Sequence, residues 1–285
     1  MISRKFFYLI PIVMLVTQVP DASAVSIVTR FIGGALPANA VGGGNIVDIF
    51  NAAARTWESI YQDSHTLTLS FGWAPIDSAG NHSLIEQSGT PNRETAGLIL
   101  FDNSGAVSFY LDPTPLENEE YESVTEESQD LGGGSINVAR LYRSPLGSAA
   151  GHCDLFTVAL HEIGHALGLA SANLDFQAAI QNGSILITSP LPDTGTIVPL
   201  ASNYYGVTPH IDPEKVAYGS VMAGVSSDER RMPSDLDILA IAQVSSFQLA
   251  NSDASENPEP ERPPRSMSQS GSGFVPVPVA KGFAR

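Results

Sequence analysis

The sequence feature that most constrains the fold is the stretch LHEIGHALGLAS at residues 160–171. It belongs to a predicted helix that begins at Asp154, a residue type favoured at helix N-caps, and ends near Gly168. His161 and His165 are four residues apart, so both imidazoles leave the same face of this helix. That spacing suits two ligands of one Zn²⁺ ion, at nitrogen–metal distances of about 2.0–2.1 Å.

Glu162 follows the first histidine and points slightly off the histidine face. We therefore expect its carboxylate to reach a water on the metal without binding the metal, and to accept that water's proton. Such a zinc needs a third protein ligand, which a glycine and a close histidine supply in H-E-x-x-H-x-x-G-x-x-H. Gly168 is present, but Ser171 occupies the position of that histidine. Either the fold supplies the ligand from elsewhere in the chain, or the two histidines hold no metal.

Four further histidines are candidates for the third ligand: His65, His82, His152 and His210. His65 leads a predicted strand and His82 lies in a polar turn, so we expect both at the surface. His152 precedes His161 by nine residues, and about 13 Å of helical rise keeps it from the metal. His210 is the remaining histidine of the set.

His210 lies in the segment TPHIDPEKVAYGSVMAG, which also contains Met222. With HEIGHALG as an active-site helix and GSVMAG as a Met-turn, the sequence resembles the metzincin zinc endopeptidases. It is most similar to the leishmanolysin-like group, in which an insertion separates the helix from a third histidine shortly before the Met-turn. The short insertion in this chain favours a secreted bacterial relative. The resemblance covers roughly residues 155–246.

This resemblance implies the roles of five residues. His161, His165 and His210 would bind one catalytic Zn²⁺, Glu162 would be the general base, and Met222 would form the apolar floor beneath the metal. It implies an α+β fold of the metzincin-like zincin type, with a twisted mixed sheet, an active-site helix and a smaller C-terminal subdomain. The implied activity is hydrolysis of peptide bonds in protein or peptide substrates.

Several alternatives stay open at the level of the sequence. Gly224 stands where some metzincins carry a tyrosine ligand, so a five-coordinate site is not expected. Asp175 and Asp212 are rival third ligands, and Asp212 is also a candidate to orient an imidazole by accepting its N–H. Met222 is alternatively an ordinary core residue. The rival function is an inactive, zinc-stabilised extracellular binding module, although a structural zinc site has no need of a base such as Glu162.

Hydrophobic periodicity predicts the other elements. Strand 106–113 is either the edge that binds an extended peptide by β-augmentation or an ordinary sheet strand. Seven carboxylates between Glu117 and Asp130 predict a solvated loop; a calcium site there is possible but lacks the regular D-x-D-x-D-G spacing. The predicted helices cover residues 45–62 and 233–247, and the predicted strands cover residues 25–32, 65–76, 96–103, 106–113 and 184–189.

The ends of the chain and its charge indicate an exported protein. Residues 1–24 read as a signal peptide, with basic residues, a short apolar run and an A-x-A cleavage site, and residues 251–285 as a disordered Pro-, Ser- and Glu-rich tail. Residues 25–250 would form the catalytic domain, secreted, periplasmic or at the cell surface. The net charge of −16 argues against nucleic acid as a partner, and no further run predicts membrane insertion. Cys153 is the only cysteine, so no intramolecular disulfide is expected.

Overall fold

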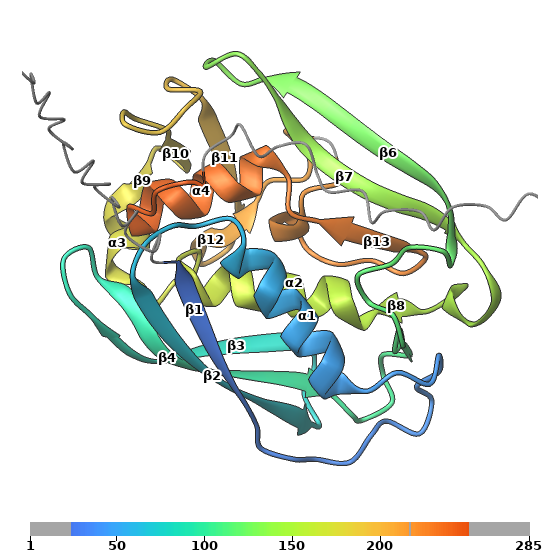
Figure 1. Cartoon of the computed structure of the whole chain (residues 1–285). Helices are drawn as coiled ribbons and strands as arrows, with labels where there is room; N and C mark the ends of the chain where they lie inside the picture. Colours follow the sequence, from blue (N-terminus) through green and yellow to red (C-terminus); the bar gives the residue numbers. More distant parts are fainter. Residues whose placement is uncertain (1–23, 217, 251–285) are drawn as a thin grey trace, which may run out of the picture. The chain divides into compact units, whose positions relative to one another are not determined.

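The computed structural model describes residues 24–216 and 218–250 (Figure 1). The predicted tail and all but the last residue of the predicted signal peptide lie outside the described residues. Within them the chain combines four α-helices with one mixed sheet and three further sheets, which confirms the α+β class. No helix in this part of the chain is long and apolar enough to cross a membrane.

The mixed sheet forms one wall of the fold and has the strand order β1-β2-β4-β3. The first three strands in that order run parallel, and β3 pairs with β4 in the antiparallel direction at the edge. Leu67, Leu69 and Phe71 of β2 are buried at alternate positions, as the sequence pattern predicts. The strands are β1 (Val25–Phe31), β2 (His65–Ala74), β4 (Arg93–Asp102) and β3 (Gly80–Ser88).

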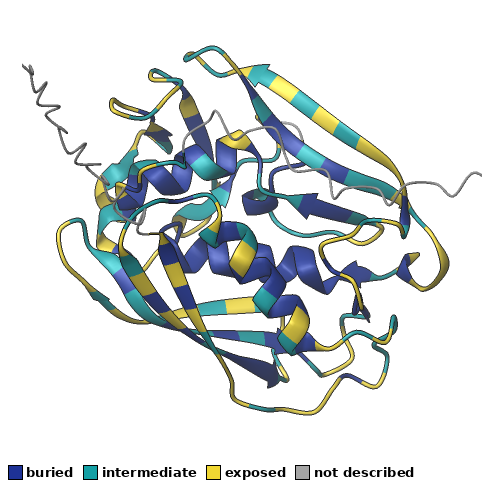
Figure 2. Cartoon of the chain, viewed as in Figure 1, coloured by how far each residue is buried: buried dark blue, intermediate teal, exposed yellow. Residues whose placement is uncertain are grey.

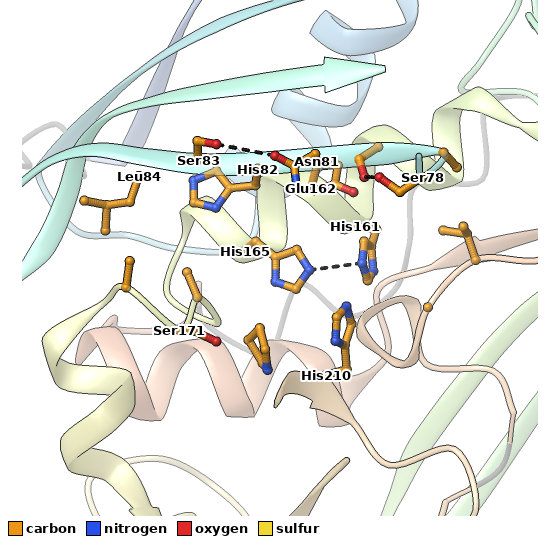
Figure 3. A pocket seen from close by; sticks show the side chains of 17 residues that line it. Ser78, Asn81, His82, Ser83, Leu84, His161, Glu162, His165, Ser171 and His210 are labelled. Carbon is orange, nitrogen blue, oxygen red and sulfur yellow. Dashed lines mark hydrogen bonds between the residues drawn. The ribbon is translucent and has the colours of Figure 1, made fainter. Parts of the chain in front are cut away.

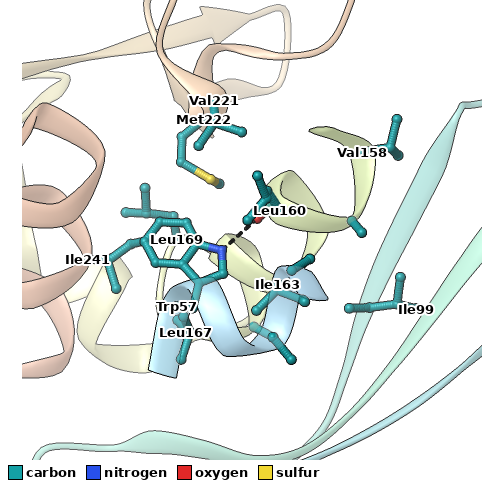
Figure 4. Close-up of a cluster of buried hydrophobic side chains, with 14 of the residues drawn as sticks. Trp57, Ile99, Val158, Leu160, Ile163, Leu167, Leu169, Val221, Met222 and Ile241 are labelled. Atoms are coloured by element: carbon teal, nitrogen blue, oxygen red, sulfur yellow. Dashed lines mark hydrogen bonds between the residues drawn. The ribbon is translucent and has the colours of Figure 1, made fainter. Parts of the chain in front are cut away.

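Two helices cover this sheet, α1 (Ile46–Glu58) and α2 (Leu155–Ala166). All residues of α2 are buried, and Figures 1 and 2 show it running through the interior between the mixed sheet and the second half of the fold. Trp57 of α1 donates its indole N–H to the Leu160 carbonyl of α2 at 3.0 Å, within the apolar cluster of Figure 4. The side chain of Asp154 caps α2 by accepting from the Thr157 N–H, as its residue type predicts.

The second half of the fold lies on the other side of α2 and carries the remaining sheets. One has the order β13-β7-β6, one has the order β12-β11-β10-β9, and β5 pairs with β8. Its helices and strands are β5 (Phe109–Tyr110), β6 (Tyr121–Asp130), β7 (Ser135–Pro145), β8 (Cys153–Asp154), α3 (Leu174–Ala179), β9 (Ile180–Gln181), β10 (Ser184–Leu186), β11 (Ile197–Asn203), β12 (Gly206–Ile211), β13 (Glu229–Met232) and α4 (Asp235–Ser245).

Two predictions about this half were wrong. Most of the acidic segment is not a loop but the edge strand β6, because its main chain pairs with β7 along the whole hairpin while its carboxylates face solvent. Predicted strand 106–113 shrinks to the two residues of β5. These are buried, and they pair with β8 and form an isolated bridge with Val41, so β5 offers no open edge to a peptide.

A buried cluster of charges fixes the start of α2. The side chain of Arg230 on β13 is fully buried, with Nη2 at 2.5 Å from Asp112 Oδ2 and Nε at 3.0 Å from Asp154 Oδ2. Because Asp154 is also the N-cap of α2, the guanidinium ties that helix to β13. Glu120 joins the cluster at 2.8 Å from Nη2, and burial raises its pKa to about 8.

Replacing Arg230 with methionine should lower the free energy of unfolding by about 3–5 kcal/mol, because it leaves Asp112 and Asp154 buried without a cation. Arg140→Met is the matched control, since Arg140 pairs with Glu126 at 2.7 Å but the two side chains are 39% and 52% exposed. Arg140→Met should lower the free energy of unfolding by less than about 1 kcal/mol. Urea unfolding followed by circular dichroism measures both, and equal losses would contradict this role of Arg230.

Candidate metal centre

Helix α2 places His161, Glu162 and His165 at one wall of a pocket of about 720 Å³ (Figure 3). All three side chains belong to a fully buried helix whose other residues are apolar except Thr157, with exposures of 5%, 4% and 7% for the three residues. Polar groups buried this deeply need partners. The partners come from three other parts of the chain.

His210 reaches the pocket from strand β12. Its ring centroid lies 5.2 Å from that of His161 and 4.9 Å from that of His165. The candidate ligand atoms of the three histidines lie within 4.8 Å of one another, which is close enough to hold one metal ion. In the described residues, Asp175 and Asp212 are not part of this group.

The hydrogen bonds of His161 and His165 leave the Nε2 atom of each ring available to bind a metal cation. His161 Nδ1 lies 2.8 Å from the Val221 carbonyl oxygen, and His165 Nδ1 bonds the Leu169 carbonyl. A carbonyl oxygen only accepts, so each Nδ1 carries the proton and each Nε2 presents a lone pair. The two Nε2 atoms are 3.0 Å apart, and lone pairs this close repel each other unless a cation joins them. Two nitrogen ligands on a tetrahedral Zn²⁺ lie about 3.3 Å apart, close to this spacing.

Burial also keeps the three imidazoles unprotonated when no metal is present. Desolvation lowers the pKa of His161 to about 3, with a smaller contribution from the charge of His210. It lowers the pKa of His165 and of His210 in the same direction. A neutral imidazole is the form that binds a metal ion, so the electrostatics and the geometry favour the same state.

The turn that contains Met222 packs against α2, the helix that carries His161 and His165. Met222 is fully buried in the short 3-10 helix Val221–Ala223, and a Cβ on Gly164 of α2 would lie only 2.3 Å from its sulfur. The missing side chain of Gly164 lets the methionine lie against the helix in this position. The role of Met222 as a floor beneath a metal stays a prediction.

A single carboxylate holds this turn in place. Asp237 of α4 accepts from Ser220 Oγ at 2.5 Å and from the main-chain N–H groups of Val221 and Met222. It also forms the capping box of α4 with Ser234. Because the Val221 carbonyl orients His161, these bonds connect the start of α4 to the candidate ligand.

Glu162 is clamped by the edge strand β3. A Cβ on Gly80 would lie 2.6 Å from Glu162 Oε1, and the main-chain N–H of His82 lies beside the Glu162 carboxylate. Burial nevertheless raises the pKa of Glu162 to about 8, against the opposite effect of the His82 main chain. A nearby metal cation would favour the charged carboxylate.

The structure also locates the other candidate residues. Asp175 accepts a hydrogen bond from the Asn92 N–H, and Asp212 forms an ion pair with Lys215 at 3.1 Å; neither has a hydrogen bond to an imidazole among the described residues. The imidazole of His152 bonds the Ala150 carbonyl near the surface. Cys153 is buried, and burial raises the pKa of its thiol to about 12.

The sequence analysis missed two residues that shape the site, His82 and Asp237. His82 is not in a polar turn at the surface: it lies in β3, lines the pocket and has a side chain that is 4% exposed. Gly80, His82 and Leu84 alternate with polar residues, which is a pattern typical of a strand. Because the segment is also rich in polar residues, the sequence alone predicts a turn. The capping box of Asp237 could have been found from the S-x-x-D spacing after Ser234.

Comparison with known proteins adds no relative: no family model, curated protein or solved structure matches this chain.

If the three histidines bind one metal ion together, purified wild-type protein should contain about one zinc per chain and His210→Ala should lose most of it. Asp175→Ala and Asp212→Ala are matched controls that remove the rival carboxylates and should keep the metal. Inductively coupled plasma mass spectrometry after dialysis measures the content. Full retention in His210→Ala would contradict a three-histidine site.

The metal-free protein should lose stability as the pH falls below about 6.5, where histidines of an unfolded chain take up protons. His161 stays neutral in the folded state because its pKa is lowered to about 3. Its stabilising contribution is therefore complete above pH 6.5 and is lost progressively as the pH approaches 3. Urea unfolding of chelator-treated protein tests this. His161→Gln should show a shallower decline, and an unchanged decline would disprove the role of His161.

Proposed function

We propose that the protein is an exported zinc-dependent endopeptidase of the metzincin type. The observation that carries the proposal is the convergence of the buried imidazoles of His161 and His165, the partly buried imidazole of His210 and the carboxylate of Glu162 in one pocket. His161, His165 and His210 would hold the metal, and the fourth position would remain for water or substrate. The resemblance of HEIGHALG and GSVMAG to metzincin motifs supports the same assignment.

In this proposal the chain orients groups around the metal, and Glu162 moves the proton. A bound Zn²⁺ supplies Lewis-acid chemistry, which activates water and polarises a carbonyl. Glu162 accepts the proton of the attacking water and passes it to the leaving amine. Its place between Gly80 and the His82 N–H holds the carboxylate beside the histidines without making it a ligand.

The pocket wall suits a peptide in extended conformation. Strand β3 is an edge strand that lines the pocket from Gly80 to Leu84, so a substrate can pair with it by β-augmentation. This edge takes the role that the sequence analysis considered for residues 106–113. The lining includes Ala170, Ala172 and Gly224, and no Lys or Arg is among the described lining residues. Such a surface favours main-chain recognition over binding of anionic groups.

The alternative is a binding module in which the same histidines hold a structural zinc. A structural site uses all four zinc positions for protein ligands. In the described residues only three ligands converge, and the fourth neighbour is a carboxylate held by β3. The arrangement therefore favours a site open to substrate.

Glu162→Gln should lower kcat by about 10²–10⁴-fold, because the amide cannot accept a proton, while the zinc content stays at the wild-type level. Glu86→Gln makes the same change on an exposed glutamate of β3 and should leave kcat unaltered. Hydrolysis of a mixed peptide library followed by mass spectrometry measures the activity. Zinc-loaded wild type that is as inert as Glu162→Gln on all peptides would favour the binding module.

A further inference from the structure

A second buried polar pair lies in the wall of the same pocket, outside the chemistry assigned above. His82 Nε2 on β3 is 2.9 Å from Glu94 Oε1 on β4, and their side chains are 4% and 1% exposed. The His82 ring lies beside that of His165, with 6.4 Å between the centroids (Figure 3). Burying an imidazole and a carboxylate is unfavourable unless each finds a partner. The pair therefore lies buried beside the candidate metal centre, where each group depends on the other for its hydrogen bond.

A local irregularity of the sheet aims Glu94 at His82. The β3–β4 pairing shifts register twice between residues 84 and 87. In a regular strand every second residue faces the same side of the sheet. On β4 the first three buried residues are Glu94, Gly97 and Ile99, so the spacing between the first two is three residues instead of two. This shift turns Glu94 to the same face as the rest of the buried residues. Bulges near active sites commonly redirect a side chain in this way.

The space above Gly97 is shaped for the glutamate. A Cβ at Gly97 would lie 2.1 Å from Glu94 Oε1, so any larger residue would displace the carboxylate from His82. Glu94 Oε2 is buried without a hydrogen-bond partner among the described residues, and burial raises the pKa of Glu94. Packing alone would favour an apolar residue here, which indicates that the bond to His82 is the reason for the glutamate.

The main chain of His82 links this pair to Glu162. Gly80 on the same strand packs against the Glu162 carboxylate, and the main-chain N–H of His82 lies beside it. Strand β3 has a strand neighbour on one side only, so few contacts hold it beyond its ladder with β4 and the bonds of Gln87 to Ala172 and Leu174. The position of that N–H therefore depends on what ties β3 down, and the buried pair with Glu94 is such a tie.

We propose that His82 and Glu94 are positioning residues for Glu162: their buried hydrogen bond anchors edge strand β3, and β3 in turn holds the Glu162 carboxylate toward the three histidines. The inference deepens the proposed peptidase function and rests on it. Neither side chain binds the metal or takes a proton from the substrate. A displacement of the base by about 1 Å can lower a rate by about 100-fold, so the anchor matters to catalysis.

His82→Phe and Glu94→Met test the proposal, because each removes the hydrogen bond and keeps most of the buried volume. His65→Phe is the matched control, since His65 bonds the main-chain carbonyl of Glu94 rather than its side chain. For each variant we would measure zinc content, kcat and KM on a peptide that the wild type cleaves, and deuterium uptake of Gly80–Ser88 by mass spectrometry.

We expect His82→Phe and Glu94→Met to lower kcat by about 100-fold, with KM and zinc content little changed and faster deuterium uptake in β3. His82→Gln, which can still donate to Glu94, should recover part of kcat, and His65→Phe should retain all of it. Wild-type kcat in both variants would overturn the inference. If the wild type cleaves no peptide, the peptidase proposal fails; unchanged deuterium uptake in the two variants would then overturn the anchor separately.

Discussion

The complete burial of α2 is the constraint on which the rest of the structure depends. This helix carries two imidazoles and a carboxylate into an apolar interior, where each polar group needs a partner from another element. The Val221 turn orients His161, the chain after α2 bonds His165, and Gly80 of β3 packs against Glu162. The mixed sheet, the Met222 turn and the β12 sheet therefore surround one helix.

The sequence predicted best those features that depend on local patterns. The N-cap at Asp154, the i, i+4 histidines of α2, and both long flanking helices follow from residue type and periodicity, and the structure has all of them. The approach of His210 is different, because no local pattern brings β12 to α2. It was expected only through the resemblance of its segment to a Met-turn region, and the structure brings its ring to the other two.

The features that escaped prediction depend on partners far along the chain. Strand β6 has too many carboxylates to suggest a strand, and only its hairpin with β7 makes it one. His82 looked like a surface residue because its neighbours Asn81 and Ser83 are polar, whereas the register shift of β4 places Glu94 beside it. Arg230 gave no signal, since its three acidic partners lie more than 70 residues away in sequence. Long-range pairing of this kind cannot be read from one segment alone.

This chain has a single cysteine, and a metal ion bound through His210 could serve as a cross-link in place of a disulfide. A metal ion bound by all three imidazoles joins α2 to β12 and so closes the long segment between His165 and His210 into a loop. Cross-links that close long loops stabilise a fold mainly by reducing the freedom of the unfolded chain. A bound metal ion, rather than a disulfide, would then provide the cross-link of this chain, and folding would be coupled to metal binding.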